Sequence, residues 1–220
     1  MSRGDEIAAG LRSVRERIEA ASRRAGRDAG AVTLVAVSKT FPADAVELAI
    51  AAGATHVGEN RVQETREKKP LVRAAARWHL IGHLQSNKVK DAVELFDVIE
   101  SVDSAELAAR LARSAQSIGK RQEILLQVNI GREPQKSGAD PEVVPELVRT
   151  IGAMASLSLR GLMAIPPVGD SRLHFRALRA LRDSAGLEHL SMGMSADYEI
   201  AVEEGATIVR VGSAIFGSRR

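Results

Sequence analysis

The sequence predicts an α/β fold, a (β/α)₈ TIM barrel, in a single domain that spans residues 1–220. Eight short apolar runs recur along the chain at intervals of roughly 25 residues, close to the repeat of such a barrel. Between these runs lie segments whose apolar residues recur at three- and four-residue steps, which is the spacing of helices. Apart from the adjacent Pro166 and Pro167, Pro and Gly occur singly, and no low-complexity stretch interrupts the pattern, so we expect no linker and no second domain.

The eight apolar runs are rich in β-branched residues and are short enough to be buried strands of a parallel sheet. The predicted strands are 33–39, 55–60, 77–83, 97–102, 123–130, 157–165, 188–194 and 207–213. The helical segments between them are 42–53, 61–76, 87–96, 104–119, 141–155, 171–186 and 196–205. Several of these segments end in Gly, which is the residue preferred at a left-handed helix C-cap.

An additional helix is predicted at about residues 5–25, before the first strand. Seven helical segments follow strands, because the chain stops shortly after the eighth strand. We expect the N-terminal helix to fill the vacant place and complete the outer ring. A doubly wound open sheet is the alternative fold, but the sequence has no G-x-G-x-x-G motif to favour it.

Composition limits the location and the partners of the protein. No apolar run approaches the length of a membrane span, and the charged N-terminus lacks the apolar stretch of a signal peptide. The chain has no cysteine, which excludes disulfides and thiol catalysis and agrees with a cytoplasmic location. The net charge is +3, but basic residues are mixed with acidic ones and only 3% of residues are aromatic. We therefore expect neither membrane association nor nucleic-acid binding.

Polar side chains concentrate where the predicted strands end, and in a barrel of this type these ends form the functional face. In chain order they are Lys39, Glu59, Asn60, His79 to His83, Glu100, Ser101, Asn129, Ser191 to Ser195, and Arg210 to Ser213, with Met163 among them.

Lys39 is the most unusual of these residues, because it follows the apolar run of the first strand directly. Alternation along a strand puts Val35, Val37 and Lys39 on one face, but the pattern does not tell which face points into the barrel. One interpretation is a lysine that extends out of the barrel mouth into water. The other is an amine whose charged form is disfavoured by desolvation, and which can attack an aldehyde.

Small residues and hydroxyls gather at the ends of strands seven and eight, where barrels of this type often bind phosphate. Ser195 lies just before a predicted helix, and Gly212 and Ser213 end the last strand. Each has an ordinary structural interpretation, as a helix N-cap or a turn glycine. Together, and opposite Lys39, they point to pyridoxal 5′-phosphate, which combines an aldehyde with a phosphate.

Several sequence blocks resemble the YggS/PROSC family of pyridoxal-phosphate homeostasis proteins. They are AVSKT, GEN-x-VQE (58–64), WHLIGHLQSNK (78–88), QVNI with a downstream KSG, RGLMAI (160–165) and SMGMSADYEIAVEEGATIVRVGSAIFG (191–217). They occur in the order of the family and cover nearly the whole chain. The resemblance implies the barrel of the alanine racemase N-terminal domain.

The same resemblance implies roles for individual residues. Lys39 would form a Schiff base with the cofactor aldehyde, and Arg210 would lie near the pyridine nitrogen. Ser195 and the backbone amides of Gly212 and Ser213 would hold the phosphate, and Asn60 would line the ring.

Three residues near these positions have no assigned role. His79 and Met163 can equally be packing residues of the rim, and His83 stands where the family often has proline. His79 and His83 would share a strand face, but too far apart to chelate one ion easily, so we expect no metal site.

The function expected from this resemblance is a carrier of pyridoxal 5′-phosphate in cofactor homeostasis, with indirect effects on amino-acid and keto-acid balance. We expect no catalytic residue, transient exchange of cofactor with pyridoxal-phosphate-dependent enzymes, and a monomer or weak dimer. The alternative is a low-efficiency amino-acid racemase, which needs a proton donor on each face of its substrate. Alanine racemases take the second donor, a tyrosine, from an additional C-terminal domain of a partner subunit. This chain ends just after the barrel, and its sole tyrosine is Tyr198.

Overall fold

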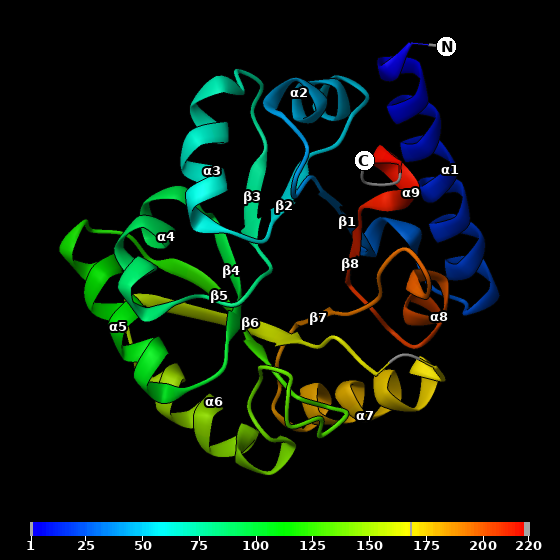
Figure 1. The fold of residues 1–220 in the computed structure, drawn as a ribbon. Coiled ribbons are helices and arrows are strands. Elements are labelled where there is room, and N and C mark those ends of the chain that lie inside the picture. Colours follow the sequence, from blue (N-terminus) through cyan, green and yellow to red (C-terminus); the bar gives the residue numbers. More distant parts are fainter. Residues whose placement is uncertain (1, 168, 218–220) are drawn as a thin grey trace.

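The computed structural model describes residues 2–167 and 169–217, and it has the predicted barrel. Eight parallel strands pair in chain order, and the eighth pairs with the first, which closes the sheet (Figure 1). The strands are β1 (Thr33–Val37), β2 (His56–Glu59), β3 (Arg77–Leu80), β4 (Val98–Val102), β5 (Gln122–Gln127), β6 (Leu157–Met163), β7 (His189–Ser191) and β8 (Ile208–Val211).

Helices surround the sheet and alternate with its strands (Figure 1). They are α1 (Arg3–Arg24), α2 (Ala43–Ala51), α3 (Val62–Lys68), α4 (Val89–Leu95), α5 (Ala105–Ser117), α6 (Val144–Gly152), α7 (Ser171–Ser184), α8 (Tyr198–Glu203) and α9 (Ser213–Phe216). Four single 3₁₀ turns accompany them, at Ala29–Ala31, Lys69–Leu71, Ser86–Lys88 and Pro141–Val143. In the part of the chain that the structure describes, no helix has the length and apolar character needed to span a bilayer.

Most strands end earlier than the sequence predicted, because the last residues of each apolar run leave the sheet and enter the following loop. Strand β3, for example, ends at Leu80 rather than at residue 83. His83 therefore lies in the loop after β3, and the prediction that it shares a strand face with His79 is wrong.

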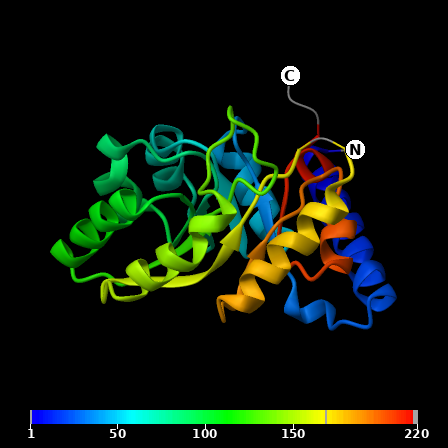
Figure 2. The same ribbon diagram turned by 90° about the horizontal axis from the view of Figure 1, so that it is seen from below.

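The N-terminal helix α1 lies on the outer ring, against α2, α8 and α9 (Figure 1). Its buried stripe of Ile7, Leu11, Val14 and Ile18 follows the helical spacing. The prediction missed α9, a single turn after β8. A side chain at Gly10 of α1 would lie 2.8 Å from the carbonyl oxygen of Ala214, so this glycine allows α1 to approach α9 closely. Figure 2 shows α9 and the beginning of α1 at the same end of the barrel.

Apolar side chains form two separate cores. The larger core lies between the strands and the helices. The smaller core lies inside the barrel and consists of Val35, Leu125, Met163 and Ile208. Met163 is fully buried there, so it is a packing residue of the barrel interior.

Candidate functional site

A cavity of about 300 Å³ opens at the carboxyl ends of the strands, and we call it the rim cavity. Its lining contains all six residues that the sequence singled out as a candidate site: Lys39, Asn60, Ser195, Arg210, Gly212 and Ser213. Apolar side chains complete it, from Val37, Phe41, Ile81, Ile165 and Met194 among others. The fold therefore brings together residues that are up to 174 positions apart in the sequence, from Lys39 to Ser213.

The structure decides which face of β1 points inward. Val35 belongs to the core inside the barrel, and Val37 and Lys39 line the rim cavity. Leu34 and Ala36, on the opposite face, pack toward the helices. Lys39 is thus carried on the inward face and is half-buried at the mouth of the barrel.

Polar contacts hold the backbone on both sides of Lys39, and those made by Ser38 are buried. The hydroxyl of Ser38 donates to Glu59 Oε1 at 2.6 Å, and its carbonyl oxygen accepts from Lys68 Nζ at 3.0 Å. On the other side, the amide of Thr40 donates to Glu64 Oε1 at 2.6 Å. Thr40 has φ 70°, a conformation that a β-branched residue rarely adopts. These contacts compensate for the strained backbone and fix the direction in which Lys39 leaves the strand.

Lys68 joins these contacts into one cluster. Its ammonium group donates to Glu59 Oε1 at 2.6 Å and to Glu64 Oε1 at 2.8 Å, and its side chain is 6% exposed. Burial raises the pKa of Glu59, although the hydrogen bonds from Lys68 and Ser38 act in the opposite direction. Sequence reasoning missed this cluster. The i,i+4 spacing of Glu64 and Lys68 was a visible signal, but the participation of Glu59 depends on the folded chain.

Asn60 is held in place by the close approach of a glycine on the next loop. A Cβ atom at Gly82 would lie 2.3 Å from the carbonyl oxygen of Asn60 and 2.9 Å from its side-chain Cγ. Only glycine allows these two segments to lie so close together. Asn60 therefore has a defined place on the wall of the rim cavity.

Ser195, Gly212 and Ser213 line the cavity from the loop after β7 and the end of β8, the strand that pairs with β1. The amide of Gly212 donates to Ser195 Oγ at 3.3 Å, and Ser213 begins α9. Two features shape the loop that carries Ser195. Gly193 has φ 91°, and the Asp197 carboxylate accepts from the amide of Met194 at 2.7 Å. The result is a group of hydroxyls and backbone amides, suited to an anion, in the lining of the same cavity as Lys39.

Replacing Ser195 with alanine should weaken retention of a bound phosphate group without abolishing binding, because the backbone amides of Gly212 and Ser213 remain. We expect about a tenfold faster release, the effect of one lost hydrogen bond to a charged group. Release can be followed by dialysis against buffer. If Ser195→Ala releases pyridoxal phosphate at the parent rate, the phosphate is not held here.

Arg210 reaches the rim cavity from inside the barrel and is 3% exposed. Its Nη1 donates to Ser191 Oγ at 2.6 Å, and its Nη2 donates to the carbonyl oxygen of Ala164 at 2.9 Å. Glu100 supplies a nearby negative charge, with Oε2 at 3.9 Å from Arg210 Nη1. Burial lowers the pKa of Arg210, and the charges of Glu100 and Asp197 oppose this effect.

The contacts of Arg210 continue as a buried chain across the barrel interior. Glu100 Oε2 accepts from Ser191 Oγ at 2.5 Å, and Oε1 lies 2.6 Å from His79 Nδ1. Burial alone would raise the pKa of Glu100, but the hydrogen bond from His79 and the charge of Arg210 lower it overall. The ionised carboxylate therefore accepts a hydrogen bond from His79 Nδ1–H. His79 Nε2 then accepts from His56 Nδ1, 2.8 Å away. His79 is thus a member of a polar layer inside the barrel.

The row of hydrogen bonds from Arg210 to His56 makes the stability of the fold depend on pH, through His56. The pKa of His56 is lowered to about 4, chiefly by burial and then by the neighbouring His79 and Arg77. Between pH 6.5 and about 4, the unfolded chain binds a proton at His56 and the folded chain does not. The free energy of unfolding should therefore have its full value above pH 6.5 and fall as the pH is lowered toward 4. Urea denaturation at several pH values measures this slope, and His56→Gln should reduce it. An unchanged slope in that variant would contradict the assignment.

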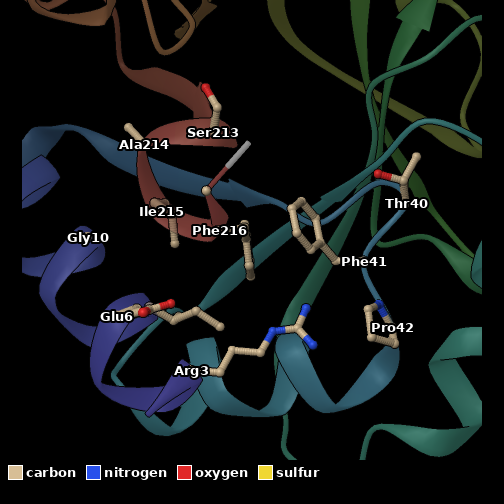
Figure 3. A pocket seen from close by; sticks show the side chains of 12 residues that line it. Arg3, Glu6, Gly10, Thr40, Phe41, Pro42, Ser213, Ala214, Ile215 and Phe216 are labelled. Carbon is tan, nitrogen blue, oxygen red and sulfur yellow. The ribbon is translucent and has the colours of Figure 1, made fainter. Parts of the chain in front are cut away.

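A larger cavity, of about 790 Å³, adjoins the rim cavity and lies between the start of α1, the loop after β1 and α9 (Figure 3). The two cavities share Phe41, Ser213 and Gly217. The rings of Phe41 and Phe216 face each other with centroids 5.2 Å apart, and Arg3 extends toward Phe41 from α1 (Figure 3). This aromatic pair forms part of the wall between the two cavities.

Tyr198 lies away from the rim cavity. Its ring is buried beneath Arg17 of α1, whose guanidinium carbon is 5.5 Å from the ring centroid. Its hydroxyl has no hydrogen-bond partner among the described residues, and burial raises its pKa. Among the same residues, no group of three or more His, Cys, Asp or Glu side chains could hold a metal ion.

Several known proteins are similar to this chain in sequence and in fold. The family profile described as alanine racemase, N-terminal domain, matches residues 10–220. A protein of Pseudomonas aeruginosa named pyridoxal phosphate homeostasis protein is 43% identical over 220 residues. The match covers 97% of this chain and 96% of the Pseudomonas protein. A relative from Aquifex aeolicus with the same name is 41% identical, covering 96% of this chain and 97% of its own.

Solved structures extend the comparison. PipY of Synechococcus elongatus, described with pyridoxal phosphate bound, has a TM-score of 0.86 and 39% identity, covering 96% of this chain and 100% of its own. An alanine racemase from Corynebacterium glutamicum has a TM-score of 0.75 at 16% identity, with 98% of this chain matching 62% of the racemase. The second likeness concerns the fold alone. The barrel, the sequence identity over nearly the full length and the matching family profile together show that this chain belongs to the pyridoxal phosphate homeostasis protein family, which has the barrel of the alanine racemase N-terminal domain.

Proposed function

We propose that the protein binds pyridoxal 5′-phosphate in the rim cavity and carries it as a Schiff base on Lys39. One observation carries the proposal: an amine and a cluster of hydroxyl and amide groups line the same cavity of about 300 Å³, which is within the range of small-molecule sites. The bound molecule would need an aldehyde at one end and an anion at the other. Pyridoxal phosphate has both.

The proposed attachment is a reversible condensation. Lys39 would supply the amine: in its neutral form Nζ would add to the aldehyde carbon, and the aldehyde oxygen would leave as water with the two protons of the amine. The carbon–nitrogen double bond would then join Lys39 to the former aldehyde carbon of the cofactor. The reverse reaction, by addition of water, releases the aldehyde, and this is what a carrier requires.

Arg210 would face the pyridine nitrogen in this arrangement. Its guanidinium is buried, and Ser191, Ala164 and Glu100 hold it in place. A fixed positive charge at this position disfavours protonation of the ring nitrogen. The ring is then a weaker electron sink than a protonated pyridine, but alanine racemases also use an arginine here, so Arg210 alone does not distinguish a carrier from an enzyme.

A non-catalytic role is supported by the position of the sole tyrosine. Racemisation requires a second proton donor on the face of the substrate opposite the lysine. Tyr198 is buried beneath α1 and does not line the rim cavity. The names of the relatives from Pseudomonas aeruginosa and Aquifex aeolicus, and the pyridoxal phosphate in PipY, agree with a role in cofactor homeostasis.

Loading the protein with pyridoxal phosphate tests the proposal. We expect a visible absorption band, and borohydride should convert it to a stable adduct that peptide mapping places on Lys39. Mixing the loaded protein with an aminotransferase stripped of its cofactor should restore the activity of that enzyme. A protein that stays colourless after loading would refute the proposal.

Isotope exchange distinguishes the proposed carrier from the alternative, a weak racemase. Loaded protein is incubated with L-alanine or L-serine in D₂O, and deuterium at Cα is measured. A carrier should give no more exchange than free pyridoxal phosphate at the same concentration. Faster exchange would favour the enzyme.

A further inference from the structure

A separate cavity of about 580 Å³ opens next to the rim cavity, and we call it the side cavity. It is lined by Asn60, Arg61, Val62, Gln63, His83, Gln85 and Lys88. These residues come from the start of α3 and from the loop between β3 and α4. Asn60 lines both cavities, so they are neighbours on the same face of the barrel.

The lining of the side cavity is strongly biased in charge. It contains two cations, Arg61 and Lys88, together with the imidazole of His83. The side-chain amides of Asn60, Gln63 and Gln85 supply further hydrogen-bond donors, and none of the described residues that line the cavity carries a carboxylate. Such a set of groups can donate many hydrogen bonds to an anion and places no negative charge against it.

The two cations differ from most arginines of the protein in having no acidic partner among the described residues. The nearby acids are engaged elsewhere. Glu64 of α3 accepts from Lys68 and from the amide of Thr40. Asp91 of α4 pairs with Arg66 at 2.6 Å. Glu64 and Asp91 are thus used in the folded chain, and Arg61 and Lys88 keep their charges available to a ligand.

We propose that the side cavity is a second anion-binding site, which takes the phosphate or carboxylate group of a small molecule. Arg61 can bind such a group with two parallel hydrogen bonds, and Lys88 adds a point charge. His83 is available as a further contact, because its ring makes only a long contact of 3.5 Å, between Nδ1 and Ser137 Oγ. The cavity is larger than one anionic group needs, so it has room for the rest of the molecule.

The location of the side cavity would allow a bound anion to change the affinity for the cofactor; this part of the proposal rests on the function proposed above. An anionic molecule in the side cavity would lie against Asn60, and Asn60 would contact the cofactor ring from the other side. A ligand that shifts Asn60 would change cofactor affinity, and the cofactor would change the affinity of that ligand by the same factor. The anion site itself depends only on the charges and exposure of its own residues.

An NMR titration of ¹⁵N-labelled protein tests the site. The protein is first loaded with pyridoxal phosphate and reduced with borohydride, so that the rim cavity is filled. Inorganic phosphate and acetate are then added separately, at constant ionic strength. The amides of residues 61–63 and 83–88 should shift in a saturable manner. The anion that binds more tightly identifies the site as one for phosphates or for carboxylates.

Charge-neutral variants make the test specific. In the double variant Arg61→Gln with Lys88→Gln, affinity for the preferred anion should fall at least about tenfold, because hydrogen bonds to charged groups are lost. The control is Arg73→Gln with Lys90→Gln, which removes the same charge at exposed positions outside the cavity and should bind like the parent. Equal binding by the Arg61/Lys88 variant, shifts centred on other residues, or no saturable binding of either anion would overturn the proposal.

The same titration on unloaded protein keeps the two proposals apart. There, the amides of Gly212 and Ser213 should respond as well, because the rim cavity is empty of cofactor. A response at Gly212 and Ser213 alone would contradict the side-cavity site and leave the carrier function intact. A response in the side cavity alone would support the second site and contradict the phosphate position in the rim cavity.

Discussion

Replacing Lys39 with alanine is expected to abolish the visible absorption band of the loaded protein. The band requires a carbon–nitrogen double bond conjugated with the ring, and alanine has no amine to form it. The expected loss is complete at cofactor concentrations equal to that of the protein. Visible spectra before and after borohydride, with mass spectrometry of the digested protein, measure the result.

A matched control separates loss of this amine from a general loss of lysine. Lys90→Ala removes an exposed lysine outside the rim cavity and should leave the band unchanged. Circular dichroism should show the Lys39→Ala barrel to be folded, because the side chain is only half-buried. A band of the same wavelength and intensity in Lys39→Ala would place the attachment on another lysine.

Replacing Glu100 with alanine should produce the largest loss of stability that we expect from a single substitution. Glu100 is fully buried and interacts with His79, Ser191 and Arg210. Its removal leaves the buried guanidinium of Arg210 without its nearest counter-charge. Breaking a buried ion pair from one side costs about 3–5 kcal/mol. The free energy of unfolding from urea denaturation at neutral pH measures the effect.

An exposed acid provides the comparison for Glu100. Glu106 pairs with Arg110 on the surface of α5, and Glu106→Ala should change the free energy of unfolding by less than about 1 kcal/mol. Glu100→Gln keeps an acceptor for Ser191 and should be less harmful than Glu100→Ala. If Glu100→Ala and Glu106→Ala are equally stable, Arg210 does not depend on Glu100.

The barrel fold was predictable because it follows from local patterns of apolar residues in the sequence. Apolar runs of strand length and helical periodicity depend on neighbours within a few residues, and both were read correctly along most of the chain. Strand ends were less accurate: β3 ends at Leu80, whereas the prediction extended it to His83, because an apolar residue, Ile81, still follows the last paired residue. The single turn of α9 was missed because four residues are too short for any periodicity.

The list of candidate site residues was also available from the sequence, through the rule that strand ends form the functional face and through the resemblance to a family. All six line one cavity. Glu59, His79 and Glu100 were expected among the polar residues at the strand ends, but the contacts by which they support the site were not predicted, and Lys68 was missed. Glu59 and Lys68 beside Lys39, and Glu100 and His79 behind Arg210, act through contacts between different strands or between a strand and a helix.

The sequence by itself determined the eight strands, the helices between them and the residues that arrive at the strand ends. The tertiary structure decided that Lys39 faces inward, that Arg210 is balanced by Glu100 across the barrel, and that Arg61 and Lys88 share a cavity without an acid. The physical reason is the distance along the sequence between the residues that interact. Hydrophobic periodicity acts along the chain, whereas the inward face of a strand and the partner of a buried charge are settled only when the sheet closes on itself.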